Sequence, residues 1–157
     1  MLEIKEVRCG YDNKEIVKGV SFNVERGNNL CIVGPNGCGK STLLKSIANL
    51  LEYKGNIKLD SKEISKLNRK DLAKSVALMT QASNIYFPYT VYETVALGRY
   101  AHLKGVFSRI NKEDDEIILK SITNVGLMDI KDKLISELSG GQLQRVYLAR
   151  AFAQDPD

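Results

Sequence analysis

The chain has 157 residues, of which 43% are hydrophobic and 27% are charged, and its formal net charge is +4. This is the length of about one domain with an ordinary globular composition, which excludes wholesale disorder. The positive surplus is small, and the longest basic cluster, at residues 68–70, ends at Asp71. We therefore expect no nucleic-acid partner.

The cysteine pattern and the N-terminus favour an intracellular protein. Cys9, Cys31 and Cys38 share no Cys-x-x-Cys or Cys/His spacing, so we expect neither a disulfide framework nor a zinc site. Residues 1–6 alternate between apolar and charged side chains, unlike the apolar segment of a signal peptide. No apolar run approaches the roughly 18 residues of a membrane span, so we expect a chain that does not itself cross a membrane.

Two kinds of strand are predicted. Apolar and polar residues alternate at residues 2–4, 20–24 and 57–59, which indicates strands with one buried face. Residues 30–33 and 76–79 are apolar at every position, which is typical of strands inside a buried parallel sheet. The sequence therefore predicts both an exposed sheet and a buried one.

The helices are predicted from apolar spacing and from residues that cap first turns. Spacing indicates helices over residues 41–51 and 69–75. Thr90 begins a Thr-x-x-Glu capping box, and Asn111 precedes an acidic first turn that suits the positive end of a helix dipole. Ser139 is placed to cap a last helix. Strands followed by helices indicate an α/β fold with a helical insertion.

Residues 34–41 read Gly-Pro-Asn-Gly-Cys-Gly-Lys-Ser and match the phosphate-loop pattern G-x-x-x-x-G-K-[ST]. Glycines let successive backbone N–H groups converge on an anion, and a following helix adds partial positive charge. Lys40 supplies a full charge to the outer phosphates, and Ser41 offers a hydroxyl to Mg²⁺. The pattern predicts a nucleoside triphosphate site but not its use, because adenylate-type kinases, GTPases and transport ATPases all carry it.

A second glycine-rich motif narrows these alternatives. Residues 138–142 read Leu-Ser-Gly-Gly-Gln and resemble the signature motif of ATP-binding cassette (ABC) ATPases. Tyr11 and Gln81 stand where that family keeps its adenine-stacking aromatic and its Q-loop glutamine. The resemblance covers residues 1–157. It implies an α/β P-loop NTPase (RecA-like) core with an N-terminal antiparallel β subdomain and a helical insertion, truncated before the Walker B strand.

The resemblance also implies three parts of the chain. Residues 1–80 would form the β subdomain and the phosphate-loop part of the core, residues 81–138 a helical subdomain, and residues 139–157 the signature and an incomplete return to the core. In the family, the Walker B carboxylates and a switch histidine follow. We therefore expect the parent protein to be an ABC-type ATPase, and this chain to bind ATP but hydrolyse it poorly.

Site roles follow from the same resemblance. Lys40 and Gln81 would be catalytic, and Ser41 and Gln81 would lie in the Mg²⁺ shell. The residues expected to contact ATP are Tyr11, Gly34, Pro35, Asn36, Gly37, Cys38, Gly39, Lys40, Ser41, Thr42, Ser139, Gly140, Gly141 and Gln142. From the residues alone, Tyr11 could instead be a core aromatic and Gln81 a surface glutamine.

The family implies partners as well as cofactors. In ABC proteins the signature of one cassette closes over ATP held by another, so we expect a head-to-tail pair of cassettes with ATP and Mg²⁺. Transmembrane permease subunits would be direct partners and an upstream solute-binding protein an indirect one, with the chain peripheral on the cytoplasmic face of the membrane. The apolar residues 85–87 either receive the permease or pack onto their own domain.

Residues 97–102, Leu-Gly-Arg-Tyr-Ala-His, resemble a segment of cassettes that drive uptake of iron–siderophore, haem or cobalamin. Ala101 stands where those cassettes usually have proline. His102 has no second ligand near it in sequence, so we interpret it as an exposed loop residue. Two alternatives to an importer stay open: a soluble ABC protein that acts on nucleic acid in DNA repair or translation, and a nucleotide-binding module without catalysis.

Overall fold

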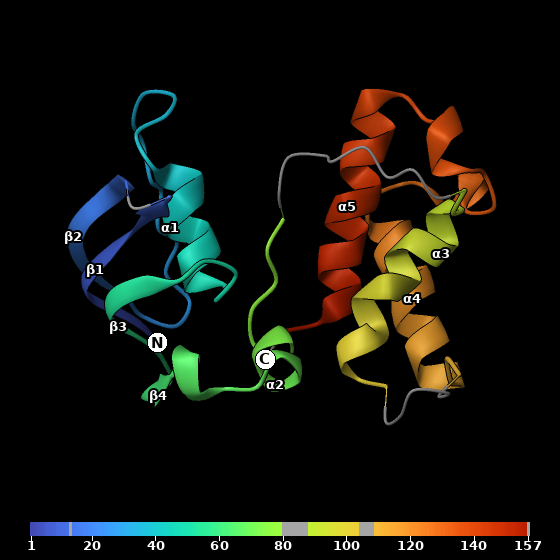
Figure 1. Ribbon diagram of the computed structural model, residues 1–157. Coiled ribbons are helices and arrows are strands. Elements are labelled where there is room, and N and C mark those ends of the chain that lie inside the picture. The colour runs from blue at the N-terminus through green and yellow to red at the C-terminus, as the bar shows by residue number, and fades with distance from the viewer. Residues whose placement is uncertain (13, 80–87, 104–108, 157) are drawn as a thin grey trace. The chain divides into compact units, whose positions relative to one another are not determined.

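A computed structural model describes residues 1–12, 14–79, 88–103 and 109–156 of the chain. It divides into two compact units, Met1–Leu72 and Ala73–Asp157 (Figure 1). The first unit is built on an antiparallel sheet, and the second is helical.

The sheet of the first unit has four antiparallel strands in the order β2–β1–β3–β4. These are β1 (Leu2–Tyr11), β2 (Lys14–Val24), β3 (Tyr53–Leu59) and β4 (Lys62–Glu63). Ile4 of β1 pairs with Phe22 of β2 on one side and with Ile57 of β3 on the other. Ile4 and Ile57 are buried, which is the outcome that alternation predicts for one face of a sheet. The three strands predicted from alternation are confirmed.

Strand β1 contains an irregularity that β3 accommodates. The register of β1 against β3 shifts between Lys5 and Arg8, and Glu6 has a φ of 49°. Opposite this bulge, Gly55 has a φ of 96°, and a Cβ there would lie 2.3 Å from the Glu6 carbonyl oxygen. The bulge therefore requires a residue without a side chain at Gly55.

The helix α1 (Lys40–Ile47) packs against β1 and β2 and buries Thr42, Leu43 and Ser46. The helix predicted over residues 41–51 is confirmed in its first two turns. It ends earlier than the pattern indicated, and Asn49, just beyond its end, has a left-handed φ of 52°. A left-handed residue cannot continue an α-helix, so Leu50 lies outside it and is exposed.

The prediction of two buried parallel strands is wrong. Residues 30–33 and 76–79 are not in strands, and Leu30 and Val33 are exposed, Val33 by 86%. A strand of this kind is held by hydrogen bonds to neighbouring strands. In the part of the chain that the structure describes, the sheet pairs only β1 to β4 with one another. The apolar composition of these segments is therefore not sufficient to make them strands.

The second unit packs its helices around one apolar core. Its helices, in chain order, are α3 (Val91–Ala96), η2 (Leu97–Ala101), α4 (Lys112–Asn124), η3 (Met128–Ile130), η4 (Ile135–Glu137) and α5 (Gly140–Gln154). Two short helices precede them in sequence: η1 (Ile64–Lys66) belongs to the first unit, and α2 (Arg69–Ala73) contains the residue at which the first unit ends. Helices α3, α4 and α5 contact one another, as Figure 1 shows. Val95, Ile118, Ile122 and Val146 are fully buried between them. None of the helices in the described ranges has both the length and the apolar character of a membrane span.

The predicted helix caps are confirmed. At α3, the Thr90 hydroxyl accepts from the Glu93 N–H, and the Glu93 carboxylate accepts from the Thr90 N–H. At α4, the side-chain oxygen of Asn111 accepts from the Asp114 N–H at 2.8 Å. These caps begin α3 and α4 at the residues that the pattern indicated.

Candidate functional site

The phosphate-loop motif is a turn that ends directly in α1. Gly39 is the N-cap of α1 and has a φ of 102°, a conformation that residues with a side chain rarely adopt. Gly39 has no side chain, and among the described residues no side-chain hydrogen bond caps the first turn of α1. The N-terminal amides of a helix without such a cap are donors for an anion.

The loop is packed on one side and open on the other. A Cβ at Gly39 would lie 3.0 Å from Ile16 and 3.2 Å from Val17 of β2, whereas a Cβ at Gly37 would meet nothing within 4 Å. At the start of the loop, a Cβ at Gly34 would lie 2.8 Å from the Cys38 sulfur. The backbone between Gly34 and Gly39 is therefore curled tightly while the turn at Gly37 remains accessible.

Lys40 folds back over the loop that precedes it. Its Nζ donates hydrogen bonds of 2.8 Å to the carbonyl oxygens of Gly34 and Pro35, and lies 3.8 Å from the Cys38 sulfur. These acceptors are neutral, and an ammonium forms stronger hydrogen bonds with charged oxygens. The open turn, the helix N-terminus and this ammonium are together a donor set that fits a polyphosphate.

Tyr11, at the end of β1, lies beside α1. Its side chain is 42% exposed, so it is not a core aromatic. The Lys45 Nζ lies 3.4 Å from the Tyr11 phenol oxygen and 5.8 Å from the ring centroid, within the range of a cation–π contact. Within the first unit, the structure thus brings Tyr11 to the helix that carries Lys40.

A cavity of about 460 Å³ lies beside the phosphate loop. It is bounded by β2 and by residues 30–33, the segment that precedes the loop in sequence. Most of its lining is apolar, including Val20, Phe22 and Leu43. Lys18 and Lys40 are its charged side chains, and its described lining includes no carboxylate or histidine. This surface can hold apolar groups and anions, and its described lining offers no carboxylate or imidazole that could serve as a general base.

The second glycine-rich motif begins α5 in the second unit. The Ser139 hydroxyl accepts from the Gln142 N–H at 3.3 Å, and the Gln142 side-chain oxygen accepts from the Ser139 N–H at 2.9 Å. A Cβ at Gly140 or Gly141 would meet nothing within 4 Å. The N-terminal turn of α5 is therefore capped by its own residues and presents bare backbone to solvent.

One predicted site residue and one predicted surface lie outside the described residues. These are Gln81, assigned to catalysis and to the Mg²⁺ shell, and residues 85–87, assigned to a permease surface. Both assignments stay predictions.

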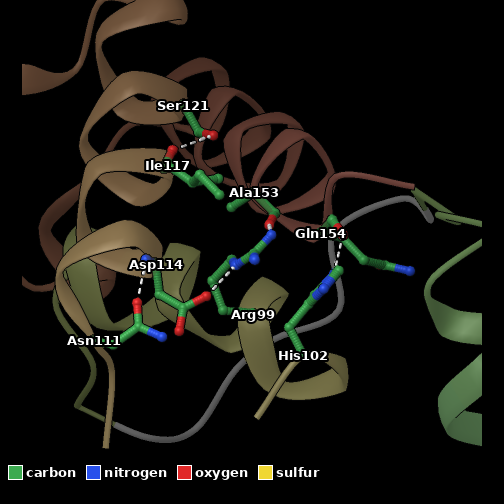
Figure 2. A network of polar contacts seen from close by, with 8 residues as sticks. All are labelled: Arg99, His102, Asn111, Asp114, Ile117, Ser121, Ala153 and Gln154. Carbon is green, nitrogen blue, oxygen red and sulfur yellow. Dashed lines mark hydrogen bonds and ion pairs between the residues drawn. The ribbon is translucent and has the colours of Figure 1, made fainter. Parts of the chain in front are cut away.

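A buried polar network in the second unit was not predicted from the sequence (Figure 2). Arg99 of η2 pairs with Asp114 of α4 at 2.8 Å between Nε and Oδ1, and its Nη1 donates to the Ala153 carbonyl of α5 at 3.0 Å. The interpretation of His102 as an exposed loop residue is wrong, because its ring is partly buried and Nε2 lies 2.8 Å from the Gln154 carbonyl oxygen. An arginine within the largely apolar segment Leu97–Ala101 was the available signal for this network.

The chain matches the family model described as ABC transporter over residues 17–157. It is 37% identical over 154 residues to the iron(3+)-hydroxamate import ATP-binding protein FhuC of Bacillus subtilis, covering 98% of this chain and 57% of that protein. It is 35% identical over 159 residues to the manganese transport system ATP-binding protein MntB of Halalkalibacterium halodurans, covering 100% of this chain and 61% of that protein. The chain thus spans little more than half the length of these relatives.

A solved structure shares the fold. The ADP conformation of MJ1267, an ATP-binding cassette of an ABC transporter, matches with a TM-score of 0.81 at 25% identity, covering 99% of this chain and 65% of that chain. The expected fold class, an α/β P-loop cassette with an antiparallel sheet at its N-terminus, is confirmed.

Proposed function

The chain belongs to the ABC transporter family, and we propose that it binds Mg-ATP through its phosphate loop as the ATP-binding subunit of an importer. The main support for this proposal is the position of the Lys40 ammonium. It donates hydrogen bonds of 2.8 Å to the carbonyl oxygens of Gly34 and Pro35. A phosphate oxygen carries more negative charge than a carbonyl oxygen. It would therefore replace the two carbonyl oxygens as the acceptor for the Lys40 ammonium. The names of FhuC and MntB, both ATP-binding proteins, support this function.

Each predicted site residue has a role in this proposal. The Lys40 ammonium and the N-terminal amides of α1 hold the phosphates, and the exposed ring of Tyr11 stacks on adenine. The Ser41 hydroxyl and the Gln81 side chain would hold Mg²⁺, which when bound neutralises phosphate charge. The remaining loop contacts would come from Gly34, Pro35, Asn36, Gly37, Cys38, Gly39 and Thr42.

We expect the 157-residue polypeptide by itself to bind ATP and to hydrolyse it slowly. Attack of water on a phosphate requires a group that orients the water and takes its proton. The described lining of the cavity beside the loop offers Lys18 and Lys40 and no carboxylate or histidine. Full ATPase activity is therefore proposed for the full-length gene product in its assembly.

The exposed backbone of the signature motif supports the proposal that a second cassette is a partner of this chain. The exposed backbone at Gly140 and Gly141 leaves room for a phosphate held by a second chain. We propose that Ser139 and Gln142 also contact that nucleotide, in a head-to-tail pair of cassettes. Permease subunits in the membrane would be the other direct partners, with a solute-binding protein acting through them at a distance. We propose that the chain works at the cytoplasmic face of the membrane.

The proposed solute is a metal chelate: an iron–siderophore, haem or cobalamin. The relative FhuC is named for iron(3+)-hydroxamate import, which supports a chelate. The relative MntB is named for manganese transport and is similarly close, so a bare metal ion is the second candidate. Uptake of radiolabelled iron–hydroxamate and of manganese, measured in cells with and without the gene, distinguishes the two.

Calorimetry with Mg-ATP tests the central claim. We expect heat of binding with the wild-type chain and none with Lys40→Ala. Lys62→Ala, which removes an exposed lysine on β4 of the same unit, is the matched control and should bind as the wild type does. A wild-type protein that gives no heat up to millimolar Mg-ATP would overturn the proposal.

A further inference from the structure

We infer that Arg99 is a positioning residue that, with Gly98 and His102, fixes the C-terminal turn of α5 and thereby orients the signature motif at the other end of that helix. The inference deepens the proposed function and rests on it, because it assigns importance to where the signature turn lies. Three separate contacts support it, and they join η2 and His102, the residue directly after η2, to the last residues of α5.

The first contact is made by a buried guanidinium. Arg99 is 6% exposed, and its Nε and Nη1 reach in two directions, to Asp114 of α4 at 2.8 Å and to the Ala153 carbonyl of α5 at 3.0 Å. Asp114 is itself held by its N–H, which donates to Asn111 (Figure 2). Because a guanidinium is planar and its donors are fixed relative to one another, it sets the position of both partners.

The second contact lies one residue further along α5. The His102 Nε2 is 2.8 Å from the Gln154 carbonyl oxygen, and because a carbonyl only accepts, Nε2 carries the hydrogen. The last carbonyls of a helix have no partner within the helix. Here two successive carbonyls, at Ala153 and Gln154, receive donors from Arg99 of η2 and from His102, the residue directly after η2. The end of α5 is therefore capped by side chains of another element.

The third contact is steric. A Cβ at Gly98 would lie 2.4 Å from the Arg150 carbonyl oxygen and 3.0 Å from the Gln154 nitrogen. The backbones of η2 and α5 are thus in direct contact at Gly98. This contact fixes their separation, while Arg99 and His102 fix the register between them.

Because α5 is a continuous helix, the position of its C-terminal end also sets the position of the signature motif at its N-terminal end. Helix α5 has 15 residues, so at about 1.5 Å per residue roughly 20 Å separates the two ends. Along its length α5 packs through apolar residues such as Val146 and Ala149. Apolar packing is not directional, whereas buried hydrogen bonds and ion pairs specify one register. Arg145, nearer the signature, adds a hydrogen bond of 3.2 Å to the Val125 carbonyl oxygen. The three contacts at the far end of α5 therefore act together with this bond to determine where Ser139 and the two glycines lie.

The experiment measures nucleotide binding and turnover separately in the full-length gene product with its natural partners. Arg99→Lys keeps the charge but not the two fixed donor directions, and His102→Leu removes the second donor. We expect turnover at saturating Mg-ATP to fall by about 10- to 100-fold in Arg99→Lys and by severalfold in His102→Leu, because small displacements of a contributing group have effects of this size. The affinity of the phosphate loop for a fluorescent ATP analogue should stay within about twofold of wild type, since its donors lie on other elements.

Arg109→Lys is the matched control, an exposed arginine of the same unit, and should leave both quantities unchanged. Wild-type turnover in both variants overturns the inference, and so does a parallel loss of affinity and turnover, which marks a general structural role. If Arg99→Lys does not fold, His102→Leu decides the matter, because His102 is only partly buried. A wild-type protein that does not bind ATP refutes the proposed function, and the inference with it, whereas an active wild type with unaffected variants refutes the inference alone.

Discussion

Arg99 and Asp114 form an ion pair that is almost entirely withdrawn from solvent, with side-chain exposures of 7% and 6% and 2.8 Å between Nε and Oδ1. Removing two charges from water is costly, so such a pair is stable only while both partners are present. Lys131 and Asp132 form an ion pair of the opposite kind in the same unit, with Asp132 81% exposed. The two pairs should respond very differently to the same substitution.

We predict that Asp114→Asn lowers the free energy of unfolding by about 3–5 kcal/mol, because the Arg99 charge stays buried without a counter-ion. Asp132→Asn makes the same chemical change in the exposed pair and should cost less than about 1 kcal/mol. Urea denaturation of the two variants and the wild type provides the comparison. Equal effects at the two positions would contradict this account of the buried pair.

A second prediction ranks the contributions to ATP binding. Hydrogen bonds to charged groups contribute about 1.5–3 kcal/mol each, and a phosphate loop makes several, whereas stacking of a base on an aromatic ring contributes about 1–3 kcal/mol. Lys40→Ala should therefore nearly abolish binding, and Tyr11→Ala should weaken it moderately. Titration with a fluorescent ATP analogue measures both.

Tyr11→Phe is the matched control for this ranking. It keeps the ring and removes only the hydroxyl, whose contact with the Lys45 ammonium is long at 3.4 Å. This variant should bind almost as the wild type does. If Tyr11→Ala proved more damaging than Lys40→Ala, the proposed division between base and phosphate contacts would be wrong.

A third prediction concerns stability at high pH. The Tyr92 hydroxyl donates a 2.5 Å hydrogen bond to Asp115. Burial, and then this hydrogen bond and the negative charge of Asp115, raise the pKa of Tyr92 from 10.0 to about 12. The folded state thus holds the phenolic proton more tightly than the unfolded state. The resulting stabilisation is fully present below pH 10.0 and is lost as the pH rises through about 12.

Tyr92→Phe tests this dependence. Below the pKa of an unperturbed tyrosine the variant should be less stable than the wild type by about 1 kcal/mol, since it lacks a partly solvent-screened hydrogen bond. The difference should shrink between about pH 10 and about pH 12. Urea unfolding at several pH values across this range measures it, and a difference that does not change with pH would exclude the raised pKa as its cause.

A fourth prediction concerns the bulge in β1. Gly55 and Gly27 both have left-handed backbones, with φ of 96° and 81°, but only at Gly55 would a Cβ clash, 2.3 Å from the Glu6 carbonyl oxygen. Gly27→Ala should cost about 1 kcal/mol from its backbone conformation alone. Gly55→Ala should cost more than about 3 kcal/mol, because the sheet must also open. Thermal unfolding of both variants compares them, and similar melting temperatures would show that the bulge adjusts freely.

The local features of the fold were predictable because they depend on neighbouring residues. The cap of α3 joins Thr90 to Glu93, and the cap of α4 joins Asn111 to Asp114, in each case three residues apart. The alternation that predicted β1 and β2 is likewise a property of a few consecutive residues. Residues 30–33 show the limit of such patterns, because apolar composition does not supply the neighbouring strands that hydrogen-bond a sheet.

For this protein, the sequence by itself determined the family, the two glycine-rich helix N-termini and the strands of the antiparallel sheet, since short motifs and local periodicity carry that information. Only the tertiary structure decided which acidic side chain in the first turn of α4 is buried against Arg99, and that His102 lies against the end of α5. The physical reason is distance along the chain. Asp114 is 15 residues from Arg99, and Gln154 is 52 from His102. Such partners meet only when the helices pack, and packing depends on the whole apolar core rather than on any short segment.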